Sequence, residues 1–214
     1  ELDKTFKMIN TKALEGTKKA YMNTLNIAHV EVANGTYDYE IAIKRAVTNL
    51  SDNGITCATY QRKNGSKVNY SIDSTVRRDV MTALNQVANK ANDKMIDELG
   101  AEYCYVSEHL GARNKGIGHQ NHESWQGQVY KNVGETSKYK NFVKTTGYGL
   151  IDGCGGVNCR HLHWAFYPGI SVLPKRMVDD KENTRIYDLL KKQRLYERKI
   201  RFFKKRSITL SEID

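Results

Sequence analysis

Apolar side chains recur at intervals of three or four residues in the first half of the chain, which predicts amphipathic helices over residues 5–33, 38–51 and 73–99. Asp38 is placed to cap the second helix, and Asn-Gly pairs follow the first two. The third helix precedes Gly100 and has the longest apolar stripe, formed by Ile72, Val76, Val80, Leu84, Val87, Ala91 and Met95. We expect these helices to have a structural role only.

Short β-prone runs predict a small, mostly antiparallel sheet. Residues 55–61 and 67–70 flank a Lys-Asn-Gly-Ser turn, which is a hairpin signal. Further strands are expected over residues 103–107 and 128–131. Cys57 and Cys104 lie in these β-prone runs, and we expect both to be small core residues.

The chemically versatile residues are concentrated between positions 103 and 174. This stretch holds five of the six histidines, both tryptophans, three of the four cysteines and most of the glycines. The sixth histidine, His29, falls inside the first predicted helix, where we expect it at the surface or at a cap. Long glycine-rich segments inside a compact domain are usually functional or are held by a staple such as a metal. The chemistry of this protein is therefore expected in this stretch.

The C-terminal part is predicted to be a long basic helix over residues 180–206. Residues 175–206 contain 13 Lys and Arg against 5 Asp and Glu, out of a net charge of +10 for the whole chain. Such a helix indicates contact with nucleic acid or with an acidic protein surface, or simply a solvated face. The candidate phosphate-binding residues are Lys191, Lys192, Arg194, Arg198 and Arg201.

Apolar positions on the same helix follow coiled-coil spacing. The positions are Ile186, Leu189, Tyr196, Ile200 and Phe203, with the polar Gln193 at one position of the same series. This seam either pairs with another helix or packs back onto the domain.

These elements predict an α+β fold with N-terminal helices, a small, mostly antiparallel sheet, a glycine-rich loop core and a long basic C-terminal helix. We expect a helical region over residues 1–100 with a hairpin near 55–70. A Cys/His/Gly-rich core of the same domain follows over 101–174, and then a basic helix and tail over 175–214. No apolar run approaches the roughly 20 residues of a membrane span, and no secretory leader opens the chain. Reduced thiols are therefore expected.

The sharpest local pattern is His119-x-x-His122 followed by Cys154-x4-Cys159-x-His161. Thiolates and imidazoles are the usual ligands of tetrahedral zinc, and two closely spaced pairs suit a structural site. Zinc is thus a candidate cofactor with the ligands His122, Cys154, Cys159 and His161, while His119 is either a ligand or part of a spacer.

An alternative hypothesis makes Cys159 the nucleophile of a hydrolase or transferase, with His122 or His161 as its base and Asn158 or Asp152 as the orienting group. The glycines around Cys154 would then donate backbone N–H groups to an oxyanion. The sequence contains neither an HExxH zinc-peptidase motif nor a Walker loop.

Other residues of this stretch also have two interpretations. Arg113 and Arg160 could each clamp a carboxylate or phosphate, but a buried arginine bonded to loop carbonyls is the commoner arrangement. The aromatic residues are expected to fill the core rather than to stack on bases: Trp125, Tyr130, Tyr148 and Trp164.

Several ordered motifs together resemble the phage minor capsid protein 2 family. They are VSEHLGAR from Val106, NHESWQGQVY from Asn121, TTGYG from Thr145, GVNCRH from Gly156 and PGIS from Pro168. The helices before and after them fit the same family, so the resemblance covers most of the chain. The motif residues singled out are His109, Arg113, Trp125, Gln126, Gly127, Tyr148, Asn158 and Arg160.

The resemblance implies a non-enzymatic virion component, made in a bacterial host, that acts in head assembly near the portal. It implies the portal or inner capsid proteins as partners, and the basic C-terminal helix makes packaged DNA a further candidate. It also implies a metal-held core whose ligand segments include His122 and residues 159–161. The sequence departs from the family pattern in its long spacer over residues 114–121 and in the position of Cys154, which lies one residue further from Cys159. The remaining ligands and the oligomeric state stay open.

Overall fold

A computed structural model describes residues 15–61, 64–175 and 178–211 of the 214-residue chain. The elements run in the order α2 (Glu15–Ala33), α3 (Tyr39–Asp52), β1 (Cys57–Gln61), β2 (Lys67–Ser71), α4 (Ile72–Glu98), β3 (Tyr103–Val106), β4 (Val129–Lys131), α5 (Phe142–Thr146), β5 (His163–Phe166) and α6 (Asp180–Ser211). Both small sheets are antiparallel, so the α+β prediction is confirmed. Residues 5–14 of the first predicted helix lie outside the described residues.

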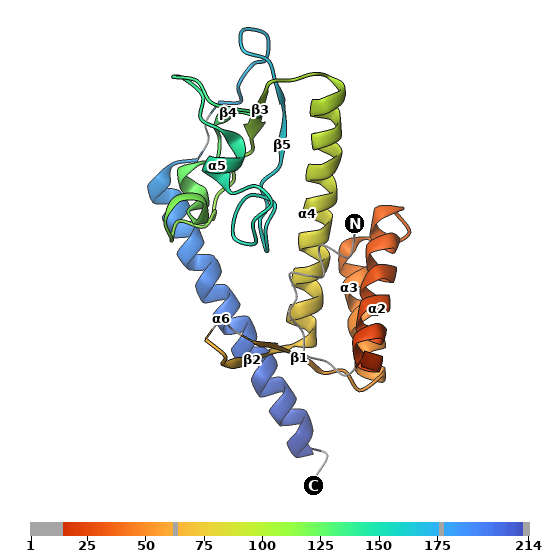
Figure 1. The fold of residues 1–214 in the computed structure, drawn as a ribbon. Helices are drawn as coiled ribbons and strands as arrows, with labels where there is room; N and C mark the ends of the chain where they lie inside the picture. Colours follow the sequence, from red (N-terminus) through yellow and green to blue (C-terminus); the bar gives the residue numbers. More distant parts are fainter. Residues whose placement is uncertain (1–14, 62–63, 176–177, 212–214) are drawn as a thin grey trace.

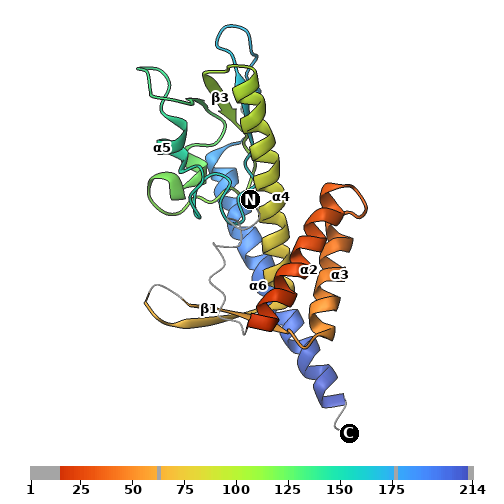
Figure 2. The same ribbon diagram turned by 45° about the vertical axis from the view of Figure 1, so that its right-hand side comes forward.

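Helices α2 and α3 pack side by side against the N-terminal half of α4, as both views show (Figures 1 and 2). The Asp38 carboxylate accepts the backbone N–H groups of Glu40 and Ile41, which confirms the predicted cap of α3. His29 is buried, at 7% exposure, so the expectation that it lies at the surface was wrong. The cluster that these three helices bury includes Tyr21, Leu25, Ala28, Ala42, Ile43, Ala46, Leu50, Ile72, Val76 and Val80.

Strands β1 and β2 form the predicted hairpin, with Cys57 opposite Ser71, and lead directly into α4. The guanidinium of Arg78 on α4 lies over the ring of Tyr60, 4.8 Å from its centroid, and attaches the hairpin to the helix. Cys57 is exposed, because Ala58 takes the inward-facing position of this strand. The prediction that Cys57 is a core residue was therefore wrong.

Helix α4 turns different faces to its neighbours along its length. Its N-terminal half packs on α2 and α3, whereas its C-terminal half packs on β5 and buries the polar Asn89. Val87 and Met95, which the predicted apolar stripe assigned to a buried face, are each 55% exposed. Four residues advance by about 400° on a helix, which is more than one full turn. A stripe built mostly from steps of four therefore winds around the helix and cannot face one partner along its whole length.

The second sheet has the strand order β4-β3-β5 and forms one side of the glycine-rich core. Strand β3 confirms a prediction and buries Cys104 completely, whereas β5 was not predicted. In β5, His163 and Phe166 are buried, while Trp164 is 41% exposed and packs its ring against Tyr105. The prediction that Trp164 fills the core was wrong.

Helix α6 begins on the glycine-rich core and then leaves it. The Asn183 amide is fully buried and bonds both backbone groups of Ala112, at 2.9 and 3.1 Å. Beyond this anchor the helix crosses the N-terminal end of α4, where Arg201 lies 3.3 Å from Asp73. In both views its C-terminal end extends past the rest of the chain (Figures 1 and 2).

The helices of the described part of the chain are too short or too polar to span a membrane.

Candidate metal site

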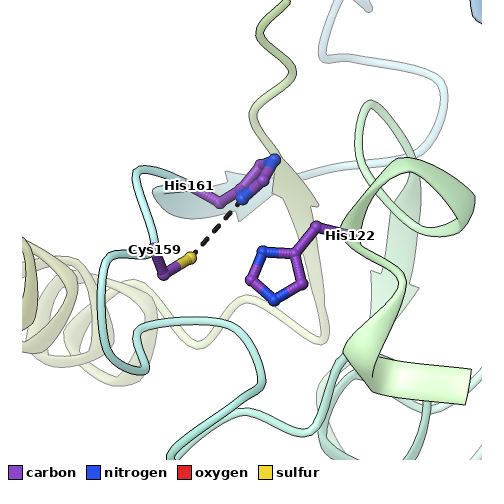
Figure 3. A group of neighbouring side chains, drawn as sticks. All are labelled: His122, Cys159 and His161. Atoms are coloured by element: carbon purple, nitrogen blue, oxygen red, sulfur yellow. Dashed lines mark hydrogen bonds between the residues drawn. The ribbon is translucent and has the colours of Figure 1, made fainter. Parts of the chain in front are cut away.

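Three potential metal ligands from two separate loops meet inside the glycine-rich core. The donor atoms of His122, Cys159 and His161 all lie within 4.8 Å of one another. The three residues are 3%, 5% and 1% exposed, respectively. Cys159 and His161 belong to one loop, and a ring nitrogen of His122 faces them from another segment (Figure 3). The structure thus brings together three of the four residues that the sequence predicted as ligands.

Gln126 fixes the tautomer of His161. The backbone N–H of His109 donates to Oε1 of Gln126 at 3.0 Å, so this oxygen can be identified as the acceptor. Nε2 of His161 lies 3.0 Å from the same oxygen and therefore donates to it. In the neutral ring, Nδ1 is then unprotonated and lies 3.4 Å from Sγ of Cys159. His161 presents a lone pair toward the thiol, which is the form that binds a metal.

His122 is oriented in the same way by a backbone carbonyl. Its Nε2 lies 2.9 Å from the carbonyl oxygen of Asp152, which can only accept, so Nε2 donates and Nδ1 is left unprotonated in the neutral ring. The ring packs against Trp125 with centroids 4.6 Å apart. The Trp125 indole in turn donates to the carbonyl oxygen of His119 at 2.9 Å. Packing and hydrogen bonding therefore both hold this imidazole in place.

Cys154 contacts Cys159 but is not one of the three mutually close ligands. The hydrogen bond from Cys154 lowers the pKa of the Cys159 thiol well below its ordinary value. The same contact, together with burial, raises the pKa of Cys154. Two buried thiols in contact cannot both ionise without a cation, so a single thiolate is favoured at Cys159. A divalent ion would remove this restriction, because it binds the thiolate form.

The loop that carries the cysteines depends on close backbone contacts. A Cβ added at Gly153 would lie 2.1 Å from the carbonyl oxygen of Gly147, and one at Gly156 would lie 2.5 Å from that of Ile151. Asn158, which comes just before Cys159, has a φ of 59°. It is the one described non-glycine residue with a positive φ, and such backbone outliers concentrate at functional sites.

Helix α4 supports this loop from behind. Asn85 and Asn89 each donate to the carbonyl oxygen of His161 at 3.1 Å, and the Thr82 hydroxyl accepts the backbone N–H of Asn158 at 3.3 Å. Hydrogen bonds between helix side chains and loop backbone groups hold the loop backbone in one position. These three polar residues therefore position the ligands without being ligands.

Other predicted residues lie around the cluster rather than in it. His119 pairs with the Asp152 carboxylate at 3.0 Å and is not among the mutually close ligands. Arg113 donates to the Asp152 carbonyl oxygen at 3.2 Å, which confirms the interpretation that it bonds loop backbone. Arg160 is exposed. Burial, reinforced by the charge of the neighbouring His161, lowers the pKa of His109 to about 4.

The aromatic motif residues act as packing groups. Trp125 and Tyr130 are each 1% exposed, as predicted for core residues. Tyr148 packs between Phe142 and His163 and donates its hydroxyl to Asp93 at 2.6 Å. The left-handed φ of 67° at Gly127 and its close approach to Glu108 explain why a glycine stands at this motif position.

Sequence reasoning missed the polar residues of α4 that face the site. Asn89, Asp93 and His163 form a hydrogen-bonded network directly behind the loop. The available signal was three polar residues, Asn85, Asn89 and Asp93, repeating every four positions on a helix that otherwise reads as structural.

The donor set fits a metal better than it fits nucleophilic catalysis. Two imidazoles with unprotonated Nδ1 atoms and a thiolate match the nitrogen and sulfur ligands of zinc, and each imidazole has its second nitrogen bonded to an acceptor. A nucleophile must reach its substrate, but Cys159 is only 5% exposed and its candidate bases are buried with it. The geometry therefore favours a closed structural site.

A known protein family matches almost the whole chain. The family described as phage minor capsid protein 2 matches residues 3–214. The chain belongs to this family. The expectation from the ordered motifs is thereby confirmed, and membership in this family supports a structural role.

Two phage proteins are similar to this minor capsid protein. One is a structural protein of Lactococcus phage mv4, which is 31% identical over 67 residues, covering 31% of this chain and 54% of that protein. The other is a structural protein of Lactococcus phage LL-H, which is 22% identical over 193 residues, covering 88% of this chain and 49% of that protein. The chain therefore spans about half the length of these relatives. No solved structure matches it.

Proposed function

We propose that this minor capsid protein is a non-enzymatic part of the phage head that acts near the portal or on the inner capsid surface. The observation that carries the proposal is the family match over residues 3–214, with similarity to phage structural proteins. Its His/Cys cluster is buried, which agrees with a role in stabilising the fold of the domain. The basic α6 leaves the domain body and offers a surface to neighbouring components (Figure 1).

A zinc ion bound by His122, Cys159 and His161, with Cys154 as the candidate fourth ligand, holds the core together in this proposal. Most of the backbone between β3 and β5 lies outside strands and helices, so few ladder hydrogen bonds fix it. When bound, the ion supplies cross-linking between the two loops, and structural zinc contributes about 10–16 kcal/mol of apparent binding free energy in small domains. Gln126 and the Asp152 carbonyl hold the two imidazoles ready for it.

Elemental analysis combined with thermal unfolding tests the zinc. The purified chain should contain one zinc per molecule, and a chelator should lower its Tm. Cys159→Ser should lose both the metal and the chelator effect. Cys57→Ser is the matched control, because Cys57 is exposed and far from the cluster in the chain. A metal-free protein whose Tm is unchanged by chelator would refute the metal while leaving the family assignment intact.

In the same proposal, the basic face of α6 lies near packaged DNA. Lys191, Arg194, Arg198 and Arg201 follow 3-4-3 spacing and therefore share one helix face. All four are exposed, although Arg201 is also paired with Asp73. Lys192 lies on an adjacent face of the helix. Contacts of this kind neutralise phosphates without reading base sequence.

The salt dependence of duplex binding tests this contact. If the basic face binds phosphates, log K should fall linearly with log salt, with a slope of about −0.9 for each phosphate contact. The double variant Arg194→Glu/Arg198→Glu should weaken binding and flatten the slope. Lys138→Glu/Lys140→Glu alters the net charge equally at two exposed loop positions and should have a much smaller effect. Equal losses in both variants would show that net charge, rather than this face, attracts DNA.

A further inference from the structure

The apolar seam of α6 is exposed beyond the point where the helix leaves the domain. Near Gly111, Ile186 and Leu190 pack closely, since a Cβ added at that glycine would lie 2.6 Å from Leu190. The other large apolar side chains of the seam are 46–60% exposed: Leu189, Tyr196, Ile200, Phe203 and Leu210. The prediction of a coiled-coil seam thus holds as a pattern, and this chain leaves most of it uncovered.

A shallow groove of about 590 Å³ lies along the exposed part of the seam. Tyr196, Ile200 and Phe203 line it, together with Lys199 and Lys204 at its edges. Seam positions from 189 to 210 cover 22 residues, or about 33 Å of helix, which is long enough for a second helix to pack along it. Groups of exposed apolar side chains of this extent mark interaction surfaces.

The charged residues that flank the seam indicate what kind of helix could pack against it. In heptad terms, Leu189, Tyr196, Phe203 and Leu210 occupy d, while Gln193, Ile200 and Ser207 occupy a. The g column beside them is entirely basic over this stretch, with Lys192, Lys199 and Arg206. The e column contains Glu197 and Lys204. One flank of the seam is therefore positive throughout, and the other is mixed.

A second copy of this chain is a poor occupant. In an antiparallel pair the g columns face each other, so Lys192, Lys199 and Arg206 would face like charges. In a parallel pair each g residue faces the e residue five positions on, so Lys192 would meet Glu197 but Lys199 would meet Lys204. Like charges at these positions destabilise a pair of helices by amounts similar to those that opposite charges contribute. The seam is thus built against self-pairing.

We propose that the seam of α6 docks an acidic amphipathic helix supplied by another protein chain, with apolar residues against Tyr196, Ile200 and Phe203 and carboxylates opposite Lys192, Lys199 and Arg206. Opposite charges along an apolar seam determine both the partner and its orientation.

Lys192 flanks the seam, whereas the four residues of the proposed DNA face lie on the other side of the helix: Lys191, Arg194, Arg198 and Arg201. Arg198, for example, is about 180° around the helix from the centre of the seam. The docking therefore requires neither the DNA contact nor the metal, and each of the three proposals can be tested independently of the others. A DNA duplex would neutralise the lysines but would leave the exposed rings of Tyr196 and Phe203 in water.

The test measures binding of the full chain to three synthetic helical peptides of about 28 residues by fluorescence anisotropy. The first has leucine at a and d and glutamate at e and g. The second replaces those glutamates with lysine. The third has the composition of the first in scrambled order. The first should bind at least roughly tenfold more tightly than either of the others, because several flanking pairs and a continuous apolar seam act together.

Variants of the chain locate the binding surface. Ile200→Glu should abolish binding of the acidic peptide, whereas Arg194→Glu/Arg198→Glu on the opposite face should leave it within about twofold. The helical circular dichroism of each variant shows whether the chain still folds. Equal binding of the first and scrambled peptides would reduce the interaction to charge attraction and overturn the proposal. So would seam-dependent dimerisation of the chain alone in sedimentation equilibrium, or displacement of the peptide by duplex DNA.

Discussion

Nε2 of His163 lies 2.8 Å from Oδ1 of Asp93, and this contact joins strand β5 to helix α4 next to the loop that carries Cys159 and His161. The other ring nitrogen lies 2.8 Å from Oδ1 of Asn89, whose amide nitrogen donates to Asn85 and to the His161 carbonyl. The Asn89 oxygen is thereby identified as an acceptor, so Nδ1 of His163 carries a proton. The Asp93 carboxylate contacts the ring through one oxygen and accepts the Tyr148 hydroxyl on the other.

This pair predicts a specific loss of stability in acid. Burial would raise the pKa of Asp93, but hydrogen bonds from His163 and Tyr148 outweigh it and hold the pKa below the ordinary value of a carboxyl group. A carboxyl whose pKa is lower in the folded state stabilises the fold above its unfolded pKa of about 3.9 and loses that contribution as the pH falls through the folded value. Asp93→Asn should therefore be destabilised at pH 7 and approach the wild type below about pH 4.

Denaturant midpoints between pH 2.5 and 7 measure this effect. Asp97→Asn is the matched control, because Asp97 lies one turn further along α4 and is exposed. Its curve should run parallel to that of the wild type. If Asp93→Asn also ran parallel to the wild type down to pH 2.5, ionisation of the Asp93 carboxyl would contribute no stability.

Gln126 is expected to control metal affinity although it is not a ligand. Its Oε1 accepts from Nε2 of His161 and from the His109 backbone, and the residue is only 3% exposed. Gln126→Leu removes the acceptor that fixes the tautomer, and loss of such a partner typically lowers metal affinity 10- to 100-fold. Zinc competition against a chromophoric chelator measures the change.

Two further variants separate orientation from general damage. Gln126→Glu retains an acceptor and should keep most of the affinity, and His119→Ala should keep nearly all of it, because His119 is outside the ligand cluster. An affinity loss in His119→Ala as large as that in Gln126→Leu would show that His119 belongs to the ligand set after all.

The cysteine-bearing loop should reject a methyl group at Gly153. The added Cβ would lie 2.1 Å from a backbone oxygen, which cannot move aside as a flexible side chain could. We expect Gly153→Ala to lower the free energy of unfolding by about 3 kcal/mol, as overpacking does. Gly134→Ala is the control, since its left-handed φ of 75° carries a conformational cost of about 1 kcal/mol but no atom lies nearby. Similar urea midpoints for the two variants would argue against a tightly closed loop.

Local rules explain how much of the fold could be predicted. The cap at Asp38, the hairpin turn and the ends of α4 each depend on a few adjacent residues, and all were predicted within a few positions. Strand β5 was missed because four residues, two of them His163 and Trp164, carry too little alternation to indicate a strand. It forms because β3 offers a partner, which is a property of the assembled fold.

The residues of the candidate site, too, could be predicted only in part. Residue types and close spacing sufficed to select His122, Cys159 and His161, because few side chains bind metal and these were concentrated in one stretch. Spacing could not separate them from His119, which has the same chemistry but bonds Asp152 outside the cluster. The supporting residues Asn85 and Asn89 come from a helix some 70 positions earlier, and only the fold brings them to the loop.

The anchor of α6 gives the last prediction. Asn183 is fully buried and bonds the N–H and carbonyl of Ala112 and the carboxylate of Glu123. Asn183→Ala leaves the buried backbone groups of Ala112 without their partner and should lower the free energy of unfolding by about 2 kcal/mol or more. Thr184→Ala, one position on, removes only the exposed hydrogen bond from Asn114 and should change stability by less than about 0.5 kcal/mol.

Hydrogen exchange tells how the anchor acts. If Asn183 holds α6 on the core, then Asn183→Ala should accelerate amide exchange in the first turns of α6 and around Ala112 more than in α2 and α3, which pack elsewhere. Uniform acceleration across the whole chain would mean that the residue stabilises the fold globally instead. An unchanged rate in α6 would mean that other contacts, such as those of Leu190 with Gly111, suffice to hold the helix in place.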